Sequence, residues 1–339
     1  MTASLADGAP IVQNARVKSL RLALLFSACA FVLACGSAAG GSGSNPGDDG
    51  AGGSGGDATG GLGGAGGATA GSAGSPGGGG FMSGGAAGTT QGSDCAGIQQ
   101  TAEVYAHSPD TLYRLDPVTK ETKAVAKFGG CKDQVIDLAI DKSGQVFVTT
   151  FTSLERVDPV TAKCTLIAGG TTGSFPNSLS FVPAGTVSPT EETLVGYQPS
   201  AGGDAYVRID TKTGKITSLP GGLPDGYASS GDIVSVIGGG TYLTIKGTGG
   251  AYGNCADCLV EVDPKTGNVV KKLATLKFGS VFGLAFWAGV TYGFTSQGQL
   301  FSVDLKTVTA TELNIPNKPA GLKFWGAGST TCAPPVEPE

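Results

Sequence analysis

Short runs in which apolar and polar residues alternate recur from residue 104 to the C-terminal region. Alternation with a period of two predicts β-strands that bury one face. One pattern appears five times: a strand-like run, an aspartate, and turn residues such as Pro, Thr and Gly. Its aspartates are Asp116, Asp158, Asp210, Asp263 and Asp304. Because an aspartate accepts hydrogen bonds from backbone amides two or three residues later, each copy predicts strand, tight turn, strand.

The spacing of these five copies predicts the architecture. Successive aspartates are 42, 52, 53 and 41 residues apart, a period that suits the four-stranded blade of a β-propeller. Two more strand-like runs precede each copy, except that the first copy has only one upstream. Residues 320–324 supply a matching run at the other end of the chain. We therefore expect an all-β, five-bladed propeller whose first blade is closed by Ala320–Phe324.

The chain before residue 95 has a different composition. Arg16, Lys18 and Arg21 precede an apolar run of 13 residues, 22–34, which is too short for a membrane span and suits a secretion signal. A tract with 26 glycines in 59 residues follows from Gly36 onward, and it has too few large apolar residues to form a core. We expect a signal peptide over 1–34, a disordered tether over 35–94, the propeller over 95–332 and a disordered tail over 333–339.

Two resemblances add to this interpretation. The run Leu33-Ala34-Cys35 resembles a bacterial lipobox, which implies that Cys35 carries a lipid, and Gly36 after it resembles the outer-membrane sorting signal. Residues 104–325 resemble propellers of NHL and YVTN repeats, and the whole chain resembles lipoproteins with glycine-rich tethers from myxobacteria-like organisms. These resemblances imply export, a membrane contact through the lipid anchor, and a propeller fold. They do not specify a ligand.

Composition excludes several functions. The formal charge is −5 and no basic run occurs, so we expect no nucleic-acid partner. The chain has one histidine, which excludes a histidine metal cage, and we expect neither a metal nor a cofactor. We expect a monomer.

Six cysteines follow the tether, an even number that indicates disulfides in an exported chain. Cys95 precedes the first strand and Cys332 follows the closing strand, so we expect them to join. Cys255 and Cys258 lie in one long loop and are expected to pair locally, although a redox-active CxxC is the alternative. Elimination leaves the pair Cys131–Cys164.

In a propeller, the residues that begin each inner strand and end each second strand surround the channel. The candidate ligand-binding residues at this mouth are His107, Asp137, Tyr197, Asp232 and Lys246. A buried aspartate requires a donor, and we expect Lys246 to supply it. These polar residues line either a hydrated channel or a ligand pocket.

Three function classes remain. The first is a non-catalytic, lipid-anchored module of the cell envelope that binds a protein or a glycan. The alternative is a glycan-processing hydrolase with channel carboxylates at Asp137 and Asp232. The third is a lactonase or a quinone-dependent oxidoreductase, although the chain has only two tryptophans.

Overall fold

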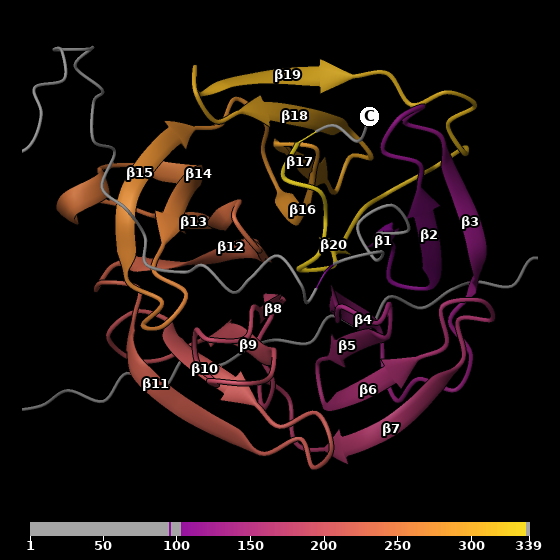
Figure 1. Ribbon diagram of the computed structural model, residues 1–339, viewed down its shortest axis with the longest axis horizontal. Coiled ribbons are helices and arrows are strands. Elements are labelled where there is room, and N and C mark those ends of the chain that lie inside the picture. Colours follow the sequence, from indigo (N-terminus) through magenta and orange to yellow (C-terminus); the bar gives the residue numbers. More distant parts are fainter. Residues whose placement is uncertain (1–94, 96–102, 337–339) are drawn as a thin grey trace, which may run out of the picture. The chain divides into compact units, whose positions relative to one another are not determined.

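The computed structural model describes Cys95 and residues 103–336, and these form five four-stranded antiparallel sheets arranged as a ring (Figure 1). The fold is therefore an all-β, five-bladed propeller. The signal peptide, the tether and Cys35 lie outside the described residues. Among those described, no helix has the length and apolarity to cross a membrane.

Each blade runs from an inner strand to an outer strand, and the bounds follow in that order. Blade 1 contains β20 (Gly326–Ser329), β1 (Val104–His107), β2 (Thr111–Leu115) and β3 (Thr122–Lys127). Blade 2 contains β4 (Val135–Ile140), β5 (Val146–Thr150), β6 (Ser153–Val157) and β7 (Cys164–Gly169). Blade 3 contains β8 (Leu179–Val182), β9 (Thr193–Gln198), β10 (Ala205–Ile209) and β11 (Ile216–Gly222). Blade 4 contains β12 (Tyr227–Val236), β13 (Gly240–Gly247), β14 (Cys255–Val262) and β15 (Val269–Thr275). Blade 5 contains β16 (Val281–Trp287), β17 (Val290–Thr295), β18 (Leu300–Asp304) and β19 (Thr309–Leu313).

The C-terminal strand closes blade 1, but six residues later than the sequence suggested. β20 pairs with β1 in antiparallel register, with Gly326 opposite His107. The predicted segment, Ala320–Phe324, is not a strand, and the Phe324 ring instead packs against Phe294 with centroids 5.1 Å apart. The inner strand lies where blades converge, so it needs small residues. A Cβ on Gly328 would lie 2.9 Å from the Leu138 side chain.

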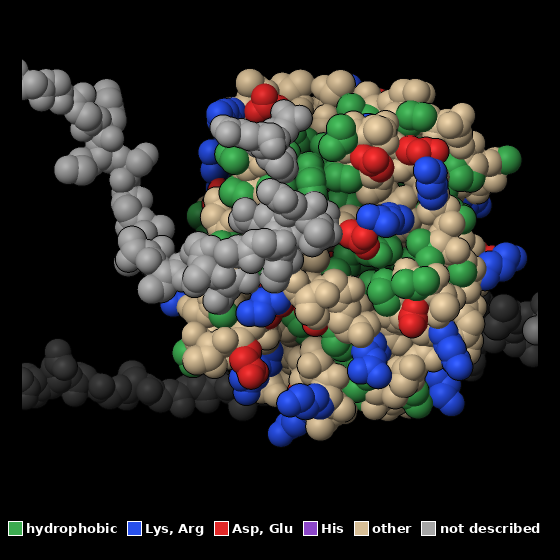
Figure 2. All heavy atoms as spheres, turned by 45° about the vertical axis from the view of Figure 1, so that its right-hand side comes forward, with side chains coloured by type: hydrophobic (Ala, Val, Ile, Leu, Met, Phe, Trp, Pro, Cys, Tyr) green, Lys and Arg blue, Asp and Glu red, His purple; other side chains and the backbone are tan. Residues whose placement is uncertain are grey.

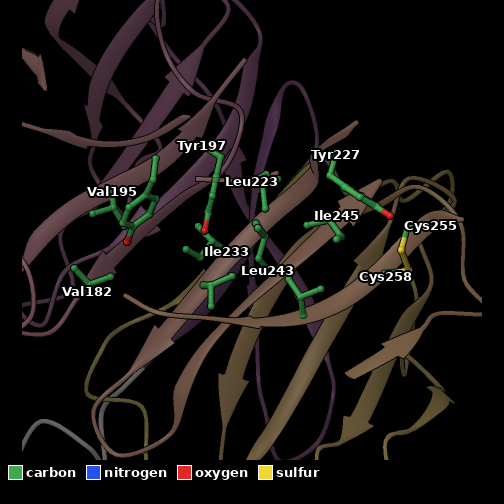
Figure 3. Packing of buried hydrophobic residues seen from close by; sticks show 13 residues of the cluster. Val182, Val195, Tyr197, Leu223, Tyr227, Ile233, Leu243, Ile245, Cys255 and Cys258 are labelled. Carbon is green, nitrogen blue, oxygen red and sulfur yellow. A yellow bond between two sulfur atoms is a disulfide. The ribbon is translucent and has the colours of Figure 1, made fainter. Parts of the chain in front are cut away.

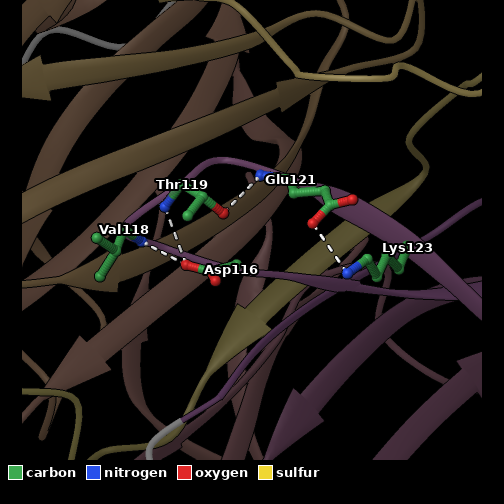
Figure 4. Close-up of polar contacts among 5 residues, drawn as sticks. All are labelled: Asp116, Val118, Thr119, Glu121 and Lys123. Atoms are coloured by element: carbon green, nitrogen blue, oxygen red, sulfur yellow. Dashed lines mark hydrogen bonds and ion pairs between the residues drawn. The ribbon is translucent and has the colours of Figure 1, made fainter.

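The five aspartate turns form as the sequence predicts. Asp116 accepts the backbone N–H groups of Val118 and Thr119 at 2.8 and 3.0 Å (Figure 4). The residue four positions after each aspartate adopts a left-handed conformation that ends the turn. The left-handed residues are Lys120, Ala162, Gly214, Gly267 and Val308. The sequence suggested glycine at this position, and two of the five turns have it.

Buried side chains fill the spaces between neighbouring blades. Between blades 3 and 4, Val195 and Tyr197 pack against Ile233 and Leu243 (Figure 3). The C-terminal segment also takes part, because Ala333 is buried and the Pro334 carbonyl accepts the N–H of Ala288 at 2.7 Å. The packed part of the chain therefore extends past the boundary expected at Cys332.

Three disulfides join the cysteine pairs that the sequence suggested: Cys95–Cys332, Cys131–Cys164 and Cys255–Cys258. The first joins the segment before β1 to the segment after β20. It therefore fastens the same two ends of the ring that the β1–β20 pairing joins.

Candidate functional site

Three of the candidate channel residues meet at the centre of the ring. His107 ends β1, Asp137 lies in β4 and Asp232 lies in β12, so each comes from a different blade. All three side chains have an exposed fraction of zero. The sequence predicted that these residues converge at the channel mouth. It did not predict their burial, because side chains at an open channel mouth would be exposed.

The two aspartates form a hydrogen-bonded carboxyl pair. Burial raises the pKa of both groups well above the ordinary value, and the charge of Asp232 raises the pKa of Asp137 further. A carboxylate has no proton to donate, so one member of the pair must be protonated. The hydrogen bond between the two carboxyl groups favours the state in which the pair shares a single proton.

Backbone amides from several blades complete the environment of this pair. Asp137 accepts the N–H of Leu179 in blade 3 at 2.6 Å, and Asp232 accepts that of Leu284 in blade 5 at 2.6 Å. Asp232 also accepts the N–H of Ala327 in the closing strand. The donors are therefore backbone groups, not the Lys246 ammonium that we expected. The pair links blades 2, 3, 4 and 5 to the closing strand.

His107 contributes an imidazole nitrogen without a partner. Its Nδ1 lies 2.9 Å from the Ser108 carbonyl oxygen, which can only accept, so Nδ1 carries the proton. Nε2 is buried and has no hydrogen-bond partner among the described residues. Burial lowers the pKa of His107 to about 4, against the opposing effect of the Ser108 carbonyl. The imidazole is neutral at pH 7.

Gly326 provides the space in which the histidine and the acid pair meet. A Cβ on this residue would lie 2.3 Å from His107 Nε2 and 2.6 Å from Asp137 Oδ1. Both contacts are shorter than any allowed van der Waals separation of these atoms. A glycine is therefore required in the closing strand at this position.

The structure separates the other two candidate residues from this cluster. Tyr197 points into the interface of blades 3 and 4, where its hydroxyl donates to the Gly267 carbonyl at 2.6 Å (Figure 3). Lys246 is exposed near Asp204 and Asp257. Burial raises the pKa of both aspartates, and the charge of Lys246 opposes that shift.

The sequence missed the residue of blade 4 that does face the centre. Thr149 pairs with Asp137 in blade 2, and the corresponding contact in blade 4 is made by Thr244, whose Oγ1 accepts the Asp232 N–H at 3.3 Å. A β-bulge between Ser229 and Ile233 shifts the register of that blade. The sequence did not reveal this bulge, so Lys246, the last residue of the expected strand, was selected instead.

This geometry constrains catalysis. The carboxyl groups of a retaining glycosidase are about 5–5.5 Å apart and those of an inverting enzyme about 6.5–9.5 Å apart, because a sugar or a water must fit between them. Asp137 and Asp232 instead hydrogen-bond directly to one another and have no exposed surface. The pair can hold a proton and tie blades together, but it offers no room for a glycosidic bond.

A second cluster lies in blade 2, where Glu155 approaches Cys131 and Cys164. One carboxylate oxygen and the two Sγ atoms all lie within 4.8 Å of one another. The sulfurs are joined as a disulfide, so they are not free to bind a metal ion. Glu155 was not among the residues predicted from the sequence, although it is the one charged residue at its position among the five repeats.

Comparisons with known proteins give similarity in fold only. No protein-family model matches the sequence, and no curated protein matches it. A protein of unknown function from Bacteroides caccae is 10% identical with a TM-score of 0.41, over 67% of this chain and 98% of that one. TolB from Acinetobacter baumannii is 16% identical with a TM-score of 0.39, over 63% and 52% of the two chains. BamB from Moraxella catarrhalis is 12% identical with a TM-score of 0.32, over 61% and 58%.

The chain thus spans about half of TolB and somewhat more of BamB. At these identities and TM-scores the likeness carries no functional argument. The propeller is established by the strand topology of the chain itself.

Proposed function

We propose that the protein is an exported, lipid-anchored β-propeller that binds an envelope protein or a glycan as a monomer and without catalysis. The central acid pair is buried and linked to several blades, so we assign it a structural role. Binding then falls to exposed loops. The observation that carries the proposal is an exposed loop after β13 that is held by side-chain hydrogen bonds. We call it the blade 4 loop and define it as residues 248–254.

The Tyr227 side chain holds the blade 4 loop by contacts with the loop backbone. Its buried hydroxyl donates to the Gly253 carbonyl at 2.9 Å, contacts the Gly249 carbonyl, and accepts the Tyr252 N–H at 3.0 Å. The rings of Tyr227 and Tyr252 also pack edge to face, with centroids 5.3 Å apart. One side chain therefore fixes most of the loop.

Two further contacts fix the end of the loop. Lys272 Nζ donates to the Tyr252 carbonyl at 2.7 Å, and the Cys255–Cys258 disulfide follows directly. Outside this framework, Thr248, Ala251 and Asn254 are exposed, as is Lys246 beside the loop. A loop already fixed in one conformation loses little entropy on binding, so this arrangement suits recognition.

The surface charge supports a partner that is not strongly charged. On the face shown in Figure 2, acidic and basic side chains are interspersed, and no large area has a single sign. A low density of charge, 14% over the chain, argues against a purely electrostatic partner. Neutral glycans and mixed protein surfaces both fit this description.

Photo-crosslinking tests the binding surface. A benzophenone side chain is placed at Ala251 in the blade 4 loop, with the same change at exposed Lys265 in another turn of blade 4 as the matched control. We expect a protein adduct in intact cells from the Ala251 position only, or saturable binding on a glycan array if the partner is a glycan. Equal adducts at both positions, or no adduct and no glycan binding, would contradict the proposal.

Tyr227→Phe sharpens this test because it removes only the hydroxyl that holds the loop. We expect binding of the crosslinked partner or of the array glycan to weaken about tenfold, equivalent to ~1.4 kcal/mol. The melting temperature of the propeller should change little. Unchanged affinity would show that the order of the loop does not matter for binding.

The lipid anchor is a separate part of the proposal, supported by the lipobox-like sequence at Cys35. Metabolic labelling with an alkyne palmitate should label the wild-type chain and not Cys35→Ala. Cys332→Ala is the control, since it removes a different cysteine. Equal labelling of wild type and Cys35→Ala, or no labelling of either, would contradict the anchor.

A further inference from the structure

The third strand of blade 2 departs from the other four blades at one core position. The residue three positions before the turn aspartate faces the interior in each blade, and four blades have an apolar or aromatic residue there. These residues are Tyr113, Val207, Val260 and Phe301, and blade 2 has Glu155. Glu155 has an exposed fraction of zero. A carboxyl group at a core position breaks the pattern that stabilises the fold, which points to a function.

The contacts of Glu155 use only one of its two oxygens. Oε1 accepts the Lys132 N–H at 2.8 Å and the Ser153 hydroxyl at 2.6 Å. Oε2 is buried and has no hydrogen-bond partner among the residues described. An unpartnered buried polar atom destabilises the folded state by about 1–3 kcal/mol. A second state of the site that supplies a donor would remove this cost.

Reduction of the neighbouring disulfide would supply that donor. Glu155 approaches the Sγ atoms of Cys131 and Cys164, and all three ligand atoms lie within 4.8 Å of one another. A disulfide has no proton to give, whereas the reduced pair has two S–H groups. Cys131 is half-buried and Cys164 is buried, so Cys131 is the residue of the pair that an incoming thiol would attack.

We propose that Cys131–Cys164 is an exchangeable disulfide that reacts with dithiols, with Glu155 relaying the proton. The first thiol of the dithiol gives its proton to Glu155 Oε2 and attacks Cys131 Sγ. A mixed disulfide forms, the bond between the two protein sulfurs breaks, and the electron pair goes to Cys164 Sγ, which takes the proton from Oε2.

The second thiol then completes the exchange. It attacks the sulfur of its own molecule in the mixed disulfide, and the released Cys131 sulfur takes its proton. The dithiol is oxidised to a disulfide and the protein pair is reduced to two thiols, so electrons and protons balance. In the reverse sequence, an excess of the oxidised dithiol re-forms the Cys131–Cys164 bond and is itself reduced to the dithiol.

The other two disulfides serve as internal references. Cys95, Cys332, Cys255 and Cys258 are all buried. In the part of the chain that the structure describes, neither of these pairs belongs to a cluster with a carboxylate like that of Glu155. If burial and the proton relay both matter, these two pairs should react more slowly than Cys131–Cys164.

The test measures each disulfide separately in the full-length protein. Samples are treated with dithiothreitol in the presence of EDTA, quenched with acid at timed points and alkylated. Peptide mass spectrometry then gives the reduced fraction of each cysteine pair. We expect Cys131–Cys164 to be reduced first, and Glu155→Gln to slow its reduction at least ~10-fold, as for loss of a general base. The other two pairs should keep their rates.

Two further variants control the interpretation. Glu155→Val introduces the residue that blades 3 and 4 have at this position, so it should fold and show the same slowing if Glu155→Gln does not fold. Glu261→Gln is the matched carboxyl-to-amide change on the third strand of blade 4, and it should leave all rates unchanged. Equal rates for Cys131–Cys164 in wild type and a folded Glu155 variant would overturn the proposal, because exposure alone would then explain the order of reduction.

Discussion

The carboxyl groups of Asp137 and Asp232 share a hydrogen bond at the centre of the ring, although the two residues belong to blades that are not adjacent. The contact needs one proton to stay bound in the folded protein. Burial, which raises the pKa of both groups, favours this state. The acid pair therefore makes the stability of the ring depend on pH.

The sign of this dependence follows from linkage. Because the folded protein binds the proton more tightly than the unfolded chain, the contribution is greatest below about pH 4 and is lost as pH rises through the elevated pKa values. Asp137→Asn should flatten this part of the profile and, by leaving a backbone N–H without an acceptor, reduce stability by about 1–3 kcal/mol. Urea unfolding from pH 4 to 8 measures both effects.

Asp158→Asn is the control. The lowered pKa of that turn aspartate gives a pH dependence of opposite sign, with a loss of stability only below about pH 4. An unchanged profile in Asp137→Asn would contradict the shared proton.

His107 should produce the opposite trend in the same pH range. Its pKa falls to about 4 in the folded protein, so only the unfolded chain gains a proton between about pH 6.5 and 4. Stability should fall by up to about 3 kcal/mol as the pH is lowered through this range. Because it is the one histidine of the chain, His107→Gln should remove this loss. The urea midpoints of wild type and His107→Gln are compared at pH 7 and again at pH 4.5. If the two proteins differ by the same amount at both pH values, the imidazole is not buried in its neutral form.

Gly326→Ala should destabilise the ring at its centre. The added Cβ would overlap His107 Nε2 and Asp137 Oδ1, and overpacking of this kind costs about 1–3 kcal/mol or more. Gly169→Ala is the control, because a Cβ there would have nothing within 4 Å. Thermal unfolding of both variants tests the claim. Equal melting temperatures would mean that the closing strand shifts to accommodate the methyl group.

Removal of residues 326–339 should leave β1 with an unpaired edge. We expect aggregation or a large fall in melting temperature, measured by size-exclusion chromatography and circular dichroism. The deletion also removes Cys332, so the double variant Cys95→Ser/Cys332→Ser serves as a control and should lose only the disulfide contribution of about 2–5 kcal/mol. Removal of 337–339 should have no effect. A monomeric truncated chain with the melting temperature of wild type would show that β20 is dispensable.

Val308→Gly should stabilise the protein by about 1 kcal/mol. Val308 has a left-handed backbone with φ of 56°, which is strained for a β-branched residue. Gly214 and Gly267 occupy the corresponding positions in blades 3 and 4. Val118→Gly, in the turn of blade 1 where the left-handed position belongs to Lys120, should give no gain. Chemical denaturation of the two variants distinguishes release of strain from a general effect of glycine.

The blade count could be predicted from sequence because the aspartate turns are local. Asp116 and its four equivalents accept hydrogen bonds from amides only two or three residues away. Each turn therefore depends on neighbouring residues alone, and the sequence motif predicts it directly. The closing strand could not be located in the same way. Gly326–Ser329 is selected by the lack of space near the centre of the ring, whereas the strand pattern of the other blades has alternating large apolar residues, which Ala320–Phe324 matches.

The candidate site could be predicted only in part. His107, Asp137 and Asp232 meet because strand ends in a propeller converge on the axis. Tyr197 and Lys246 do not join them, because side-chain direction depends on register, and register in blade 4 depends on a bulge. An alignment of the five repeats would have singled out Glu155, because it is a carboxylate where the other blades have apolar or aromatic residues.

The pairing of β1 with β20 also has a consequence for the order of events in the cell. Synthesis delivers the chain from its N-terminus, so β1 emerges early and waits for a partner near the other end. The Cys95–Cys332 bond, which spans 237 residues, waits for the same arrival. Contacts of such long sequence separation form late and slowly. Until residue 329 has emerged, the first blade has three strands and the acid pair lacks the Ala327 amide, so the finished ring is a property of the released chain.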